Sequence, residues 1–325
     1  MKNKVAVAIP TYNRLGYLKE CIESILNQTF QDFSLFVFDN ASDDPVEQEL
    51  QKYQDERIHF IGSTQNRGPI GNINRILEYP FDSEYVAIFH DDDAMHPKKL
   101  ELQSSFLDAR QGMLFVASDF NEVSDKTIRS FADFDENNMK SAVYKNPYEF
   151  VRAEMSWLRC AFGSVMYRKS AFLTARMHED KFSEFADLVF LMGISKRGPC
   201  AFLKAPLMNY RIHPGQNRVL GEEYEQGAKE MLSFCRESLP SVLDKKDEML
   251  LRRYSVNFLL RACAHINKGF FYSLRFLQKC HQQQFIRYRD FRYIDAHGLV
   301  SAVSIVLKSK KIISAARWAR SLLRS

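Results

Sequence analysis

The sequence predicts an α/β fold with a mostly parallel central sheet and helices on both faces. Short apolar runs alternate with helix-length segments through the first third of the chain. Such alternation is typical of strands that are joined by helical crossovers and lie parallel in one sheet. Polar residues also follow directly after several of these runs, where an α/β sheet binds its ligands. Beyond about residue 220 the pattern is helical, which predicts a C-terminal helical region.

Four apolar runs in the first third are the predicted strands. Residues 5–9 form a short, β-branched run ended by Pro10, as expected of a buried parallel strand. Leu18, Ile22, Ile25 and Leu26 then recur at helical spacing, so a helix should follow this strand. The remaining runs are residues 33–38, 58–61 and 85–89.

The rest of the chain is predicted to be partly stranded and then helical. Residues 113–117 and 164–167 are strand-like runs among helical segments, whereas residues 222–237 and 246–268 have the spacing of amphipathic helices. We expect a catalytic domain over residues 1–219. A basic helical region over residues 220–325 should serve membrane association or oligomerisation.

Composition indicates a globular cytoplasmic protein. Hydrophobic residues make up 46% of the 325 residues and charged residues 26%, which provides material for a core and argues against disorder. The six cysteines include no Cys-x-x-Cys pair, so free thiols are expected rather than a zinc ribbon or a redox dithiol. The apolar run near the N-terminus is too short for a signal peptide, and no stretch approaches the ~18–20 apolar residues of a membrane-spanning helix.

The sharpest chemical feature is the run His90-Asp91-Asp92-Asp93 at the end of the fourth apolar run. Adjacent carboxylates repel one another unless a cation neutralises them. Mg²⁺ and Mn²⁺ take oxygen ligands, and Mg²⁺ typically combines one or two carboxylates with substrate phosphates. The run therefore predicts a divalent metal site that bridges a diphosphate. A solvated acidic turn, or a cap for a helix beginning near Pro97, is the alternative.

Several motifs in order resemble the family 2 glycosyltransferases of the GT-A fold. They are Pro10-Thr11-Tyr12-Asn13-Arg14, Asp39-Asn40-Ala41-Ser42-Asp43-Asp44, Asn66-Arg67-Gly68 with Gly71-Asn72, and the acidic run itself. The resemblance covers about residues 1–215. It implies inverting transfer of a hexosyl or related sugar from a nucleoside-diphosphate sugar, UDP-sugar favoured, with Mn²⁺ or Mg²⁺ as cofactor. The implied acceptor is a hydroxyl of a saccharide or lipid-linked molecule in cell-surface polysaccharide synthesis, such as O-antigen or capsule.

The resemblance also implies a role for each residue of the nucleotide loop. Pro10, Thr11, Tyr12 and Arg14 would hold the nucleotide, with Tyr12 near the base and Arg14 near the diphosphate. Asp39 would hydrogen-bond the base or its ribose, which suits a carboxylate that can only accept.

In the acidic run, counting back from Pro97 puts the metal on Asp92. Asp91 then lies nearer the ribose and Asp93 is a neighbouring carboxylate, while His90 replaces the usual first aspartate of the family. Arg67 would add a cation near the donor.

Two later segments complete the implied site. Tyr210-Arg211-Ile212-His213 resembles a family element on a mobile loop, in which His213 would bind the metal or the diphosphate. Asp187 lies in an apolar stretch that resembles the segment carrying the general base, and apolar surroundings raise a carboxylate pKa toward the range useful to a base. Glu184 is the alternative base, and Asp187 as a helix cap is the structural alternative.

The C-terminal region interleaves basic with apolar and aromatic residues. Residues 308–324 have the pattern of a basic amphipathic helix at an anionic membrane surface, where each Lys or Arg contributes about 1 kcal/mol. This predicts peripheral attachment at the inner face of the plasma membrane. A packed helical appendage or a dimer contact is the alternative, and nucleic-acid binding is not expected because no recognised module accompanies the pattern.

Three other functions were weighed against an active glycosyltransferase. A nucleotidyltransferase would carry a Gly-rich basic loop after the first strand, which this chain lacks. A dehydrogenase is disfavoured because no Gly-x-Gly-x-x-Gly follows that strand. A catalytically idle nucleotide-sugar-binding subunit of a membrane assembly stays open, because Phe185 departs from the Glu-Asp pair that many relatives carry.

Overall fold

The computed structural model describes residues 3–156, 160–172, 176–177, 185–213 and 222–237, together with residues 245, 248–250, 252–256 and 259. The chain divides into two compact units. The first comprises Met1–Phe150, Arg159–Glu179 and Phe190–Gln216. The second comprises Val151–Leu158, Asp180–Val189 and Asn217–Ser325. The candidate site described below belongs to the first unit, apart from Asp187.

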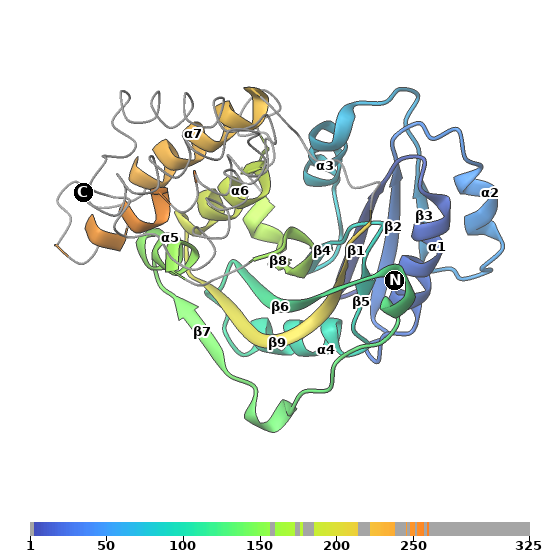
Figure 1. Cartoon of the computed structure of the whole chain (residues 1–325). Coiled ribbons are helices and arrows are strands. Elements are labelled where there is room, and N and C mark those ends of the chain that lie inside the picture. Colours follow the sequence, from blue (N-terminus) through green and yellow to red (C-terminus); the bar gives the residue numbers. More distant parts are fainter. Residues whose placement is uncertain are drawn as a thin grey trace. The chain divides into compact units, whose positions relative to one another are not determined.

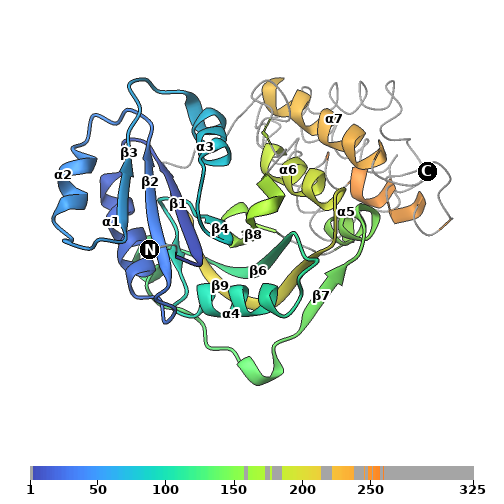
Figure 2. The same ribbon diagram turned by 180° about the vertical axis from the view of Figure 1, so that it is seen from behind.

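The strands of the described residues form one sheet in the order β3-β2-β1-β4-β8-β6-β9-β5, with β7 paired to β9. The strands are β1 (Val5–Thr11), β2 (Phe33–Asp39), β3 (Ile58–Ile61), β4 (Tyr85–Ile88), β5 (Ala94–Met95), β6 (Phe115–Val123), β7 (Ser141–Tyr144), β8 (Met166–Arg168) and β9 (Cys200–Arg211). Strands β1–β4 are mutually parallel, which confirms the predicted α/β fold. Strands β5, β7 and β8 add antiparallel neighbours. Figure 1 shows β1, β2 and β3 side by side, and Figure 2 gives the reverse view.

The helices lie in the connections between strands, except the last, which follows β9. They are α1 (Leu15–Leu26), α2 (Val46–Gln51), α3 (Gly68–Glu78), α4 (Lys99–Asp108), α5 (Pro147–Ser156), α6 (Ala186–Ser195) and α7 (Glu222–Glu237), with short 3-10 turns η1 (Asp125–Thr127), η2 (Glu136–Asn138), η3 (Phe162–Ser164) and η4 (Lys169–Phe172). Helix α1 buries Leu18, Ile22 and Ile25, as its spacing predicted. Helix α7 has the predicted bounds. Most of the predicted helix at 246–268 lies outside the described residues, and none of the described helices is long and apolar enough to cross a membrane.

The core of the first unit lies between the sheet and its helices. Every residue of β1 except Pro10 is buried, and β4 is buried throughout. At the start of α3, Gly68 takes a φ of +73°, which a residue with a side chain adopts only with strain. Pro69 in the first turn suits a helix start, because its missing N–H would be unpaired there anyway. These features fix the connection that follows β3.

Strand β9 is the main element that the sequence analysis missed, and it corrects one expectation. Tyr210 and Arg211, expected on a mobile loop, form the end of this 12-residue strand. The apolar run is interrupted by Lys204, which is exposed, and by Pro206, which cannot donate a ladder hydrogen bond. The register with β6 shifts between Leu203 and Pro206, so an irregularity in the ladder accommodates the proline.

Candidate active site

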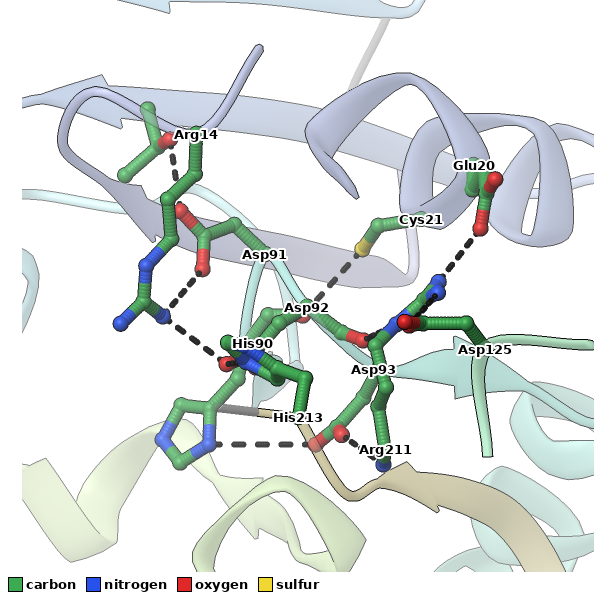
Figure 3. Close-up of polar contacts among 11 residues, drawn as sticks. Arg14, Glu20, Cys21, His90, Asp91, Asp92, Asp93, Asp125, Arg211 and His213 are labelled. Carbon is green, nitrogen blue, oxygen red and sulfur yellow. Dashed lines mark hydrogen bonds and ion pairs between the residues drawn. The ribbon is translucent and has the colours of Figure 1, made fainter. Parts of the chain in front are cut away.

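The site forms where three strand ends meet. Strand β1 ends at Thr11 and is followed by Arg14, and β4 ends two residues before the acidic loop, the name used here for residues 90–93. The short strand β5 pairs antiparallel with β9, matching Ala94 with Asn209. This pairing carries the end of β9 to the acidic loop. Figure 3 shows Arg14, Arg211 and His213 gathered around the loop.

Asp91 contacts residues from the end of β1 and the loop that follows it. Thr11 donates its hydroxyl to Asp91 Oδ2 at 2.7 Å, and Arg14 Nη1 lies 3.4 Å from Asp91 Oδ1. Burial raises the pKa of Asp91 to about 6, and the charge of Asp92 adds to the rise, while Arg14 and Thr11 oppose it. The structure thus brings together three residues that the sequence analysis selected.

Asp92 has the most cationic surroundings of the three aspartates. Arg14 Nη1 donates to its Oδ2 at 2.8 Å, and His213 Nε2 lies 3.1 Å from the same oxygen. Burial alone would raise the pKa of Asp92, but His90, His213 and Arg14 outweigh burial and hold the pKa below its ordinary value. Asp92 is therefore favoured in its ionised form, as a metal ligand must be.

Asp93 is buried, and among the described residues one of its oxygens has no hydrogen-bond partner. Its Oδ1 accepts the backbone N–H of Arg211 at 3.0 Å, whereas Oδ2 accepts no hydrogen bond from the part of the chain that the structure describes. Burial raises the pKa of Asp93 to about 7, and the neighbouring charge of Asp92 contributes. A buried carboxylate oxygen left unpaired is costly, and a bound cation would remove that cost.

The donor set around this oxygen fits a divalent ion. His90, Asp92 and Asp93 each offer one ligand atom, and these atoms lie within 4.8 Å of one another. Carboxylate and imidazole groups are common ligands of first-row divalent ions. His213 lies beside these three ligands because it contacts Asp92. Its ring lies against the ring of Tyr17, with centroids 4.7 Å apart. The geometry thus adds His90 to the predicted candidates Asp92, Asp93 and His213.

Arg211 ties the acidic loop to the rest of the unit, a role that the sequence analysis did not assign. The residue is 1% exposed, and its Nε donates to the carbonyl of Asp92 at 2.6 Å. Its guanidinium forms ion pairs with Glu20 and Asp125 (Figure 3). The same group lies over the ring of Tyr17. The sequence signal for a role of Arg211 was its place near His213 in the Tyr-Arg-x-His motif.

The residues predicted to hold the nucleoside lie at the ends of β1 and β2. Thr11 is matched with Asp39 in the parallel register, and Pro10 precedes it in β1. The carboxylate of Asp39 accepts hydrogen bonds from the backbone N–H and hydroxyl of Ser42. Tyr12 is 41% exposed, so its ring is available for stacking.

Asn40 links this region to the loop that carries Arg67. Its Oδ1 accepts the backbone N–H of Arg67 at 3.0 Å, and its Nδ2 donates to Asn66 Oδ1 at 2.8 Å. The second and third sequence motifs are therefore joined directly. The hydrogen bonds fix the backbone of Arg67 beside the end of β2.

The predicted base lies in the second compact unit. Asp187 is the second residue of α6 and is half-buried. An acidic residue in the first turn of a helix is favoured by the helix dipole, so this position agrees with both the catalytic and the structural interpretation. Glu184, the alternative base, lies outside the described residues. The assignment of the base stays a prediction.

Solved structures of two other proteins share this fold. One is S. aureus TarS 1–349 in complex with UDP-GlcNAc, with a TM-score of 0.59, 15% identity, and coverage of 97% of this chain and 92% of that chain. The other is the mannosyltransferase PcManGT of Pyrobaculum calidifontis in complex with GDP-Man and Mn²⁺, with a TM-score of 0.54, 14% identity, and coverage of 96% and 89%. At these identities the likeness establishes the fold alone.

Sequence comparison identifies the family. A GalNAc(5)-diNAcBac-PP-undecaprenol β-1,3-glucosyltransferase of Campylobacter jejuni is 40% identical over 95 residues, which are 28% of this chain and 30% of that protein. Across four such curated relatives, this chain spans 18% to 38% of their length. The model of glycosyl transferase family 2 matches residues 6–174, more than half of the chain. The chain therefore belongs to glycosyl transferase family 2.

Proposed function

We propose that this glycosyltransferase moves a hexosyl or related sugar from a UDP-sugar to a hydroxyl of a saccharide or lipid-linked acceptor, with inversion at the anomeric carbon. The observation that carries the proposal is the acidic loop, where three buried aspartates meet Arg14 and His213. One Asp93 oxygen there accepts no hydrogen bond among the described residues. Such a site suits a metal-bound diphosphate. The TarS structure, which holds UDP-GlcNAc, supports the choice of donor.

Asp92, Asp93 and His213 would hold a divalent ion, Mn²⁺ or Mg²⁺. When bound, the ion supplies positive charge beside the leaving diphosphate. Arg14 contributes further charge, since its guanidinium already lies 2.8 Å from Asp92. Charge placed in advance where it develops in the transition state is usually the largest contribution to catalysis. The PcManGT structure, with GDP-Man and Mn²⁺, supports a metal in this role.

The nucleoside would bind against the ends of β1 and β2. Tyr12 has an exposed ring that can stack on the base, and Asp39 offers acceptor oxygens to the base or the ribose. Asp91 faces the nucleotide loop through Thr11, which suits a contact with the ribose. Arg67 would hold the donor side from the neighbouring loop.

Asp187 would remove the proton of the acceptor hydroxyl as that oxygen attacks the anomeric carbon, and Glu184 is the alternative base. The bond from the anomeric carbon to the diphosphate oxygen breaks as the new glycosidic bond forms. A single displacement inverts the centre. Holding both reactants in reactive geometry would supply much of the remaining rate.

The acceptor side of the proposal draws on the C. jejuni relative, whose name describes an undecaprenol-linked substrate. A lipid-linked acceptor agrees with the basic, amphipathic pattern of residues 308–324, for which we propose reversible attachment to an anionic membrane surface. Removing residues after about 305 should weaken sedimentation with anionic liposomes and leave UDP affinity unchanged. Equal sedimentation of both forms would reject membrane attachment and would favour a dimer contact or a packed appendage.

The first test is a thermal-shift panel of UDP, GDP, dTDP and CMP, each with Mn²⁺ or with EDTA. Ligand at 100 times its dissociation constant stabilises a protein by about 2.7 kcal/mol, which gives a readable shift. We expect UDP to stabilise the protein only in the presence of metal. Stabilisation by a different nucleotide and not by UDP would assign a different donor. No thermal shift with any of the nucleotides would reject the proposed site.

The second test separates catalysis from binding. Asp187→Asn should leave metal-dependent UDP binding intact and lower sugar transfer, because only the proton acceptor is lost. Equal transfer by the variant and the parent would reject Asp187 as the base. If neither transfers sugar to any saccharide or lipid-linked acceptor while both bind UDP, the chain is an idle nucleotide-sugar-binding subunit.

A further inference from the structure

His90 differs from its neighbours in the acidic loop in offering a nitrogen in place of a carboxylate oxygen. Its side chain is 31% exposed, whereas Asp93 beside it is 1% exposed. The ring stacks on Phe162 with centroids 5.9 Å apart and an interplanar angle of 27°. The backbone carbonyl of His90 accepts the thiol of Cys21 at 3.3 Å. Backbone and ring are thus both held in place by neighbouring groups.

His90 also lies close to Asp93. Nδ1 of His90 lies 3.9 Å from Oδ2 of Asp93, which is within ion-pair distance but beyond hydrogen-bonding range. This Oδ2 is the buried oxygen that accepts no hydrogen bond among the described residues. Two ligands that each lie about 2.0–2.2 Å from one ion can be up to about 4.0–4.4 Å apart. The separation of 3.9 Å is within that limit, so it is compatible with two ligands of a single ion.

The third ligand atom comes from Asp92, within 4.8 Å of the other two. A nitrogen donor changes which ion such a site prefers. Mg²⁺ favours oxygen ligands, whereas affinity for nitrogen-containing sites rises from Mn²⁺ to Co²⁺ and Ni²⁺. A loop with a carboxylate at position 90 would offer oxygen alone.

We propose that His90 is a direct nitrogen ligand of the divalent ion, and that it shifts the preference of the site from Mg²⁺ toward first-row transition ions. This inference rests on the proposed function, because it takes the acidic loop as the metal site. A site with only oxygen ligands would not need a histidine at position 90. His213, whose Nε2 lies 3.1 Å from Asp92 Oδ2, is the competing source of nitrogen.

The experiment uses the full-length chain with Mn²⁺, Co²⁺ and Mg²⁺ as probes. Pulsed electron paramagnetic resonance of bound Mn²⁺ detects the nuclear spin of a directly bonded nitrogen. It is applied to the parent, His213→Asn, and the double variant His90→Asn/His213→Asn. We expect nitrogen coupling in the parent and in His213→Asn, and its loss in the double variant.

Affinities provide the second readout. Loss of even an outer partner of a metal costs roughly 10- to 100-fold in affinity, so His90→Asn should weaken Co²⁺ binding at least about tenfold. His90→Asp should lower the ratio of Co²⁺ to Mg²⁺ affinity by about tenfold or more, since oxygen replaces nitrogen. His96→Asn is the matched control, because its ring packs on Phe131 and Phe134 away from the loop.

The outcomes separate this inference from the proposed function. Bound Mn²⁺ without nitrogen coupling in His213→Asn would overturn the role of His90 and leave the metal-dependent function standing. Unchanged Co²⁺ to Mg²⁺ ratios in His90→Asp would do the same. Failure of the parent to bind any of the three ions would overturn both, and the nucleotide panel with EDTA would show that failure independently.

Discussion

Two buried charged clusters in the first unit respond to burial in opposite ways. In the acidic loop, three carboxylates lie together and one Asp93 oxygen is unpaired. In the second, here called the Lys99 cluster, Lys99 is 0% exposed and donates to Gln103 Oε1 and to the carbonyl of Ser164, each at 2.7 Å. Gln103 donates to the same carbonyl at 2.8 Å. Both acceptors of the lysine are uncharged.

Burial favours the uncharged form of Lys99 and of Asp93, but the two side chains differ in how well their hydrogen bonds are satisfied. Burial lowers the pKa of Lys99 to about 7, and the neutral amine still has hydrogen-bond partners. Burial likewise raises the pKa of Asp93 to about 7, yet its Oδ2 has no hydrogen-bond partner in the described residues. Polar groups of a structural cluster are normally paired. The difference supports our proposal that a ligand completes the acidic loop, whereas the Lys99 cluster joins α4 to η3.

The largest expected effect is on the metal side of this comparison. Asp92→Asn removes the ionised ligand that Arg14 and His213 surround. Loss of one group that stabilises transition-state charge costs about 10²–10³ in rate, so UDP release from the UDP-sugar with Mn²⁺ should fall by that factor. Asp55→Asn is the control, since Asp55 forms an ion pair with Arg57. Metal-dependent turnover retained by Asp92→Asn would place the metal on another residue.

Arg211 comes next, because it holds the acidic loop in place. Arg211→Met leaves Glu20 and Asp125 without this partner and releases the carbonyl of Asp92. Both acids are partly exposed and can turn to water, so we expect a loss of about 2–4 kcal/mol in unfolding free energy by urea titration. Arg211→Lys should recover only part, because a lysine lacks the planar fork that reaches several acceptors. Full recovery of the unfolding free energy in Arg211→Lys would mean that only the positive charge of Arg211 matters.

The same contacts show what the sequence could predict. Strands β1, β2 and β4 and the motifs after them were predicted, because each motif lies directly behind a local apolar pattern. Strand β9 was missed, since Lys204 and Pro206 break its pattern and only pairing with β6 reveals it. The ion pair of Arg211 joins residues 191 positions apart, and no local pattern encodes such a contact. His90 was identified as a departure from the family, but its distance to Asp93 emerges only in three dimensions.

Asp93→Asn tests the cost of the unpaired oxygen. The folded pKa of about 7 lies above the ordinary value of 3.8, so the folded state binds more protons between these values. Stability therefore falls as pH rises from about 4 to 7, and above pH 7 the metal-free parent carries the full cost. At pH 8 with EDTA, the variant should be more stable than the parent by about 1–3 kcal/mol. Added Mn²⁺ should reverse the order, and a variant less stable under both conditions would contradict an unfilled ligand position.

The smallest expected effect is on the Lys99 cluster and has the opposite pH dependence. The folded pKa of about 7 lies below the ordinary 10.5, so between these values the unfolded lysine binds more protons. The unfolding free energy of the parent should rise with pH over this window, by at most about 1.4 kcal/mol per pH unit, relative to Lys99→Met. Urea titrations at three pH values from 7.5 to 9.5 measure the difference. Lys98→Met is the matched control, because that lysine pairs with Glu136 at the surface.

Lys99→Met should also leave metal-dependent UDP binding unchanged, because the cluster is complete without a ligand. Parallel stability curves for Lys99→Met and the parent would mean that the buried amine stays charged in the folded protein. A loss of UDP binding in Lys99→Met would mean that the two clusters act as one functional unit. The route between them would be η3, because a β-carbon placed on Gly163 would lie 3.7 Å from Asp93 Oδ2. The clusters are independent if Lys99→Met changes the pH dependence of stability and leaves UDP affinity unchanged.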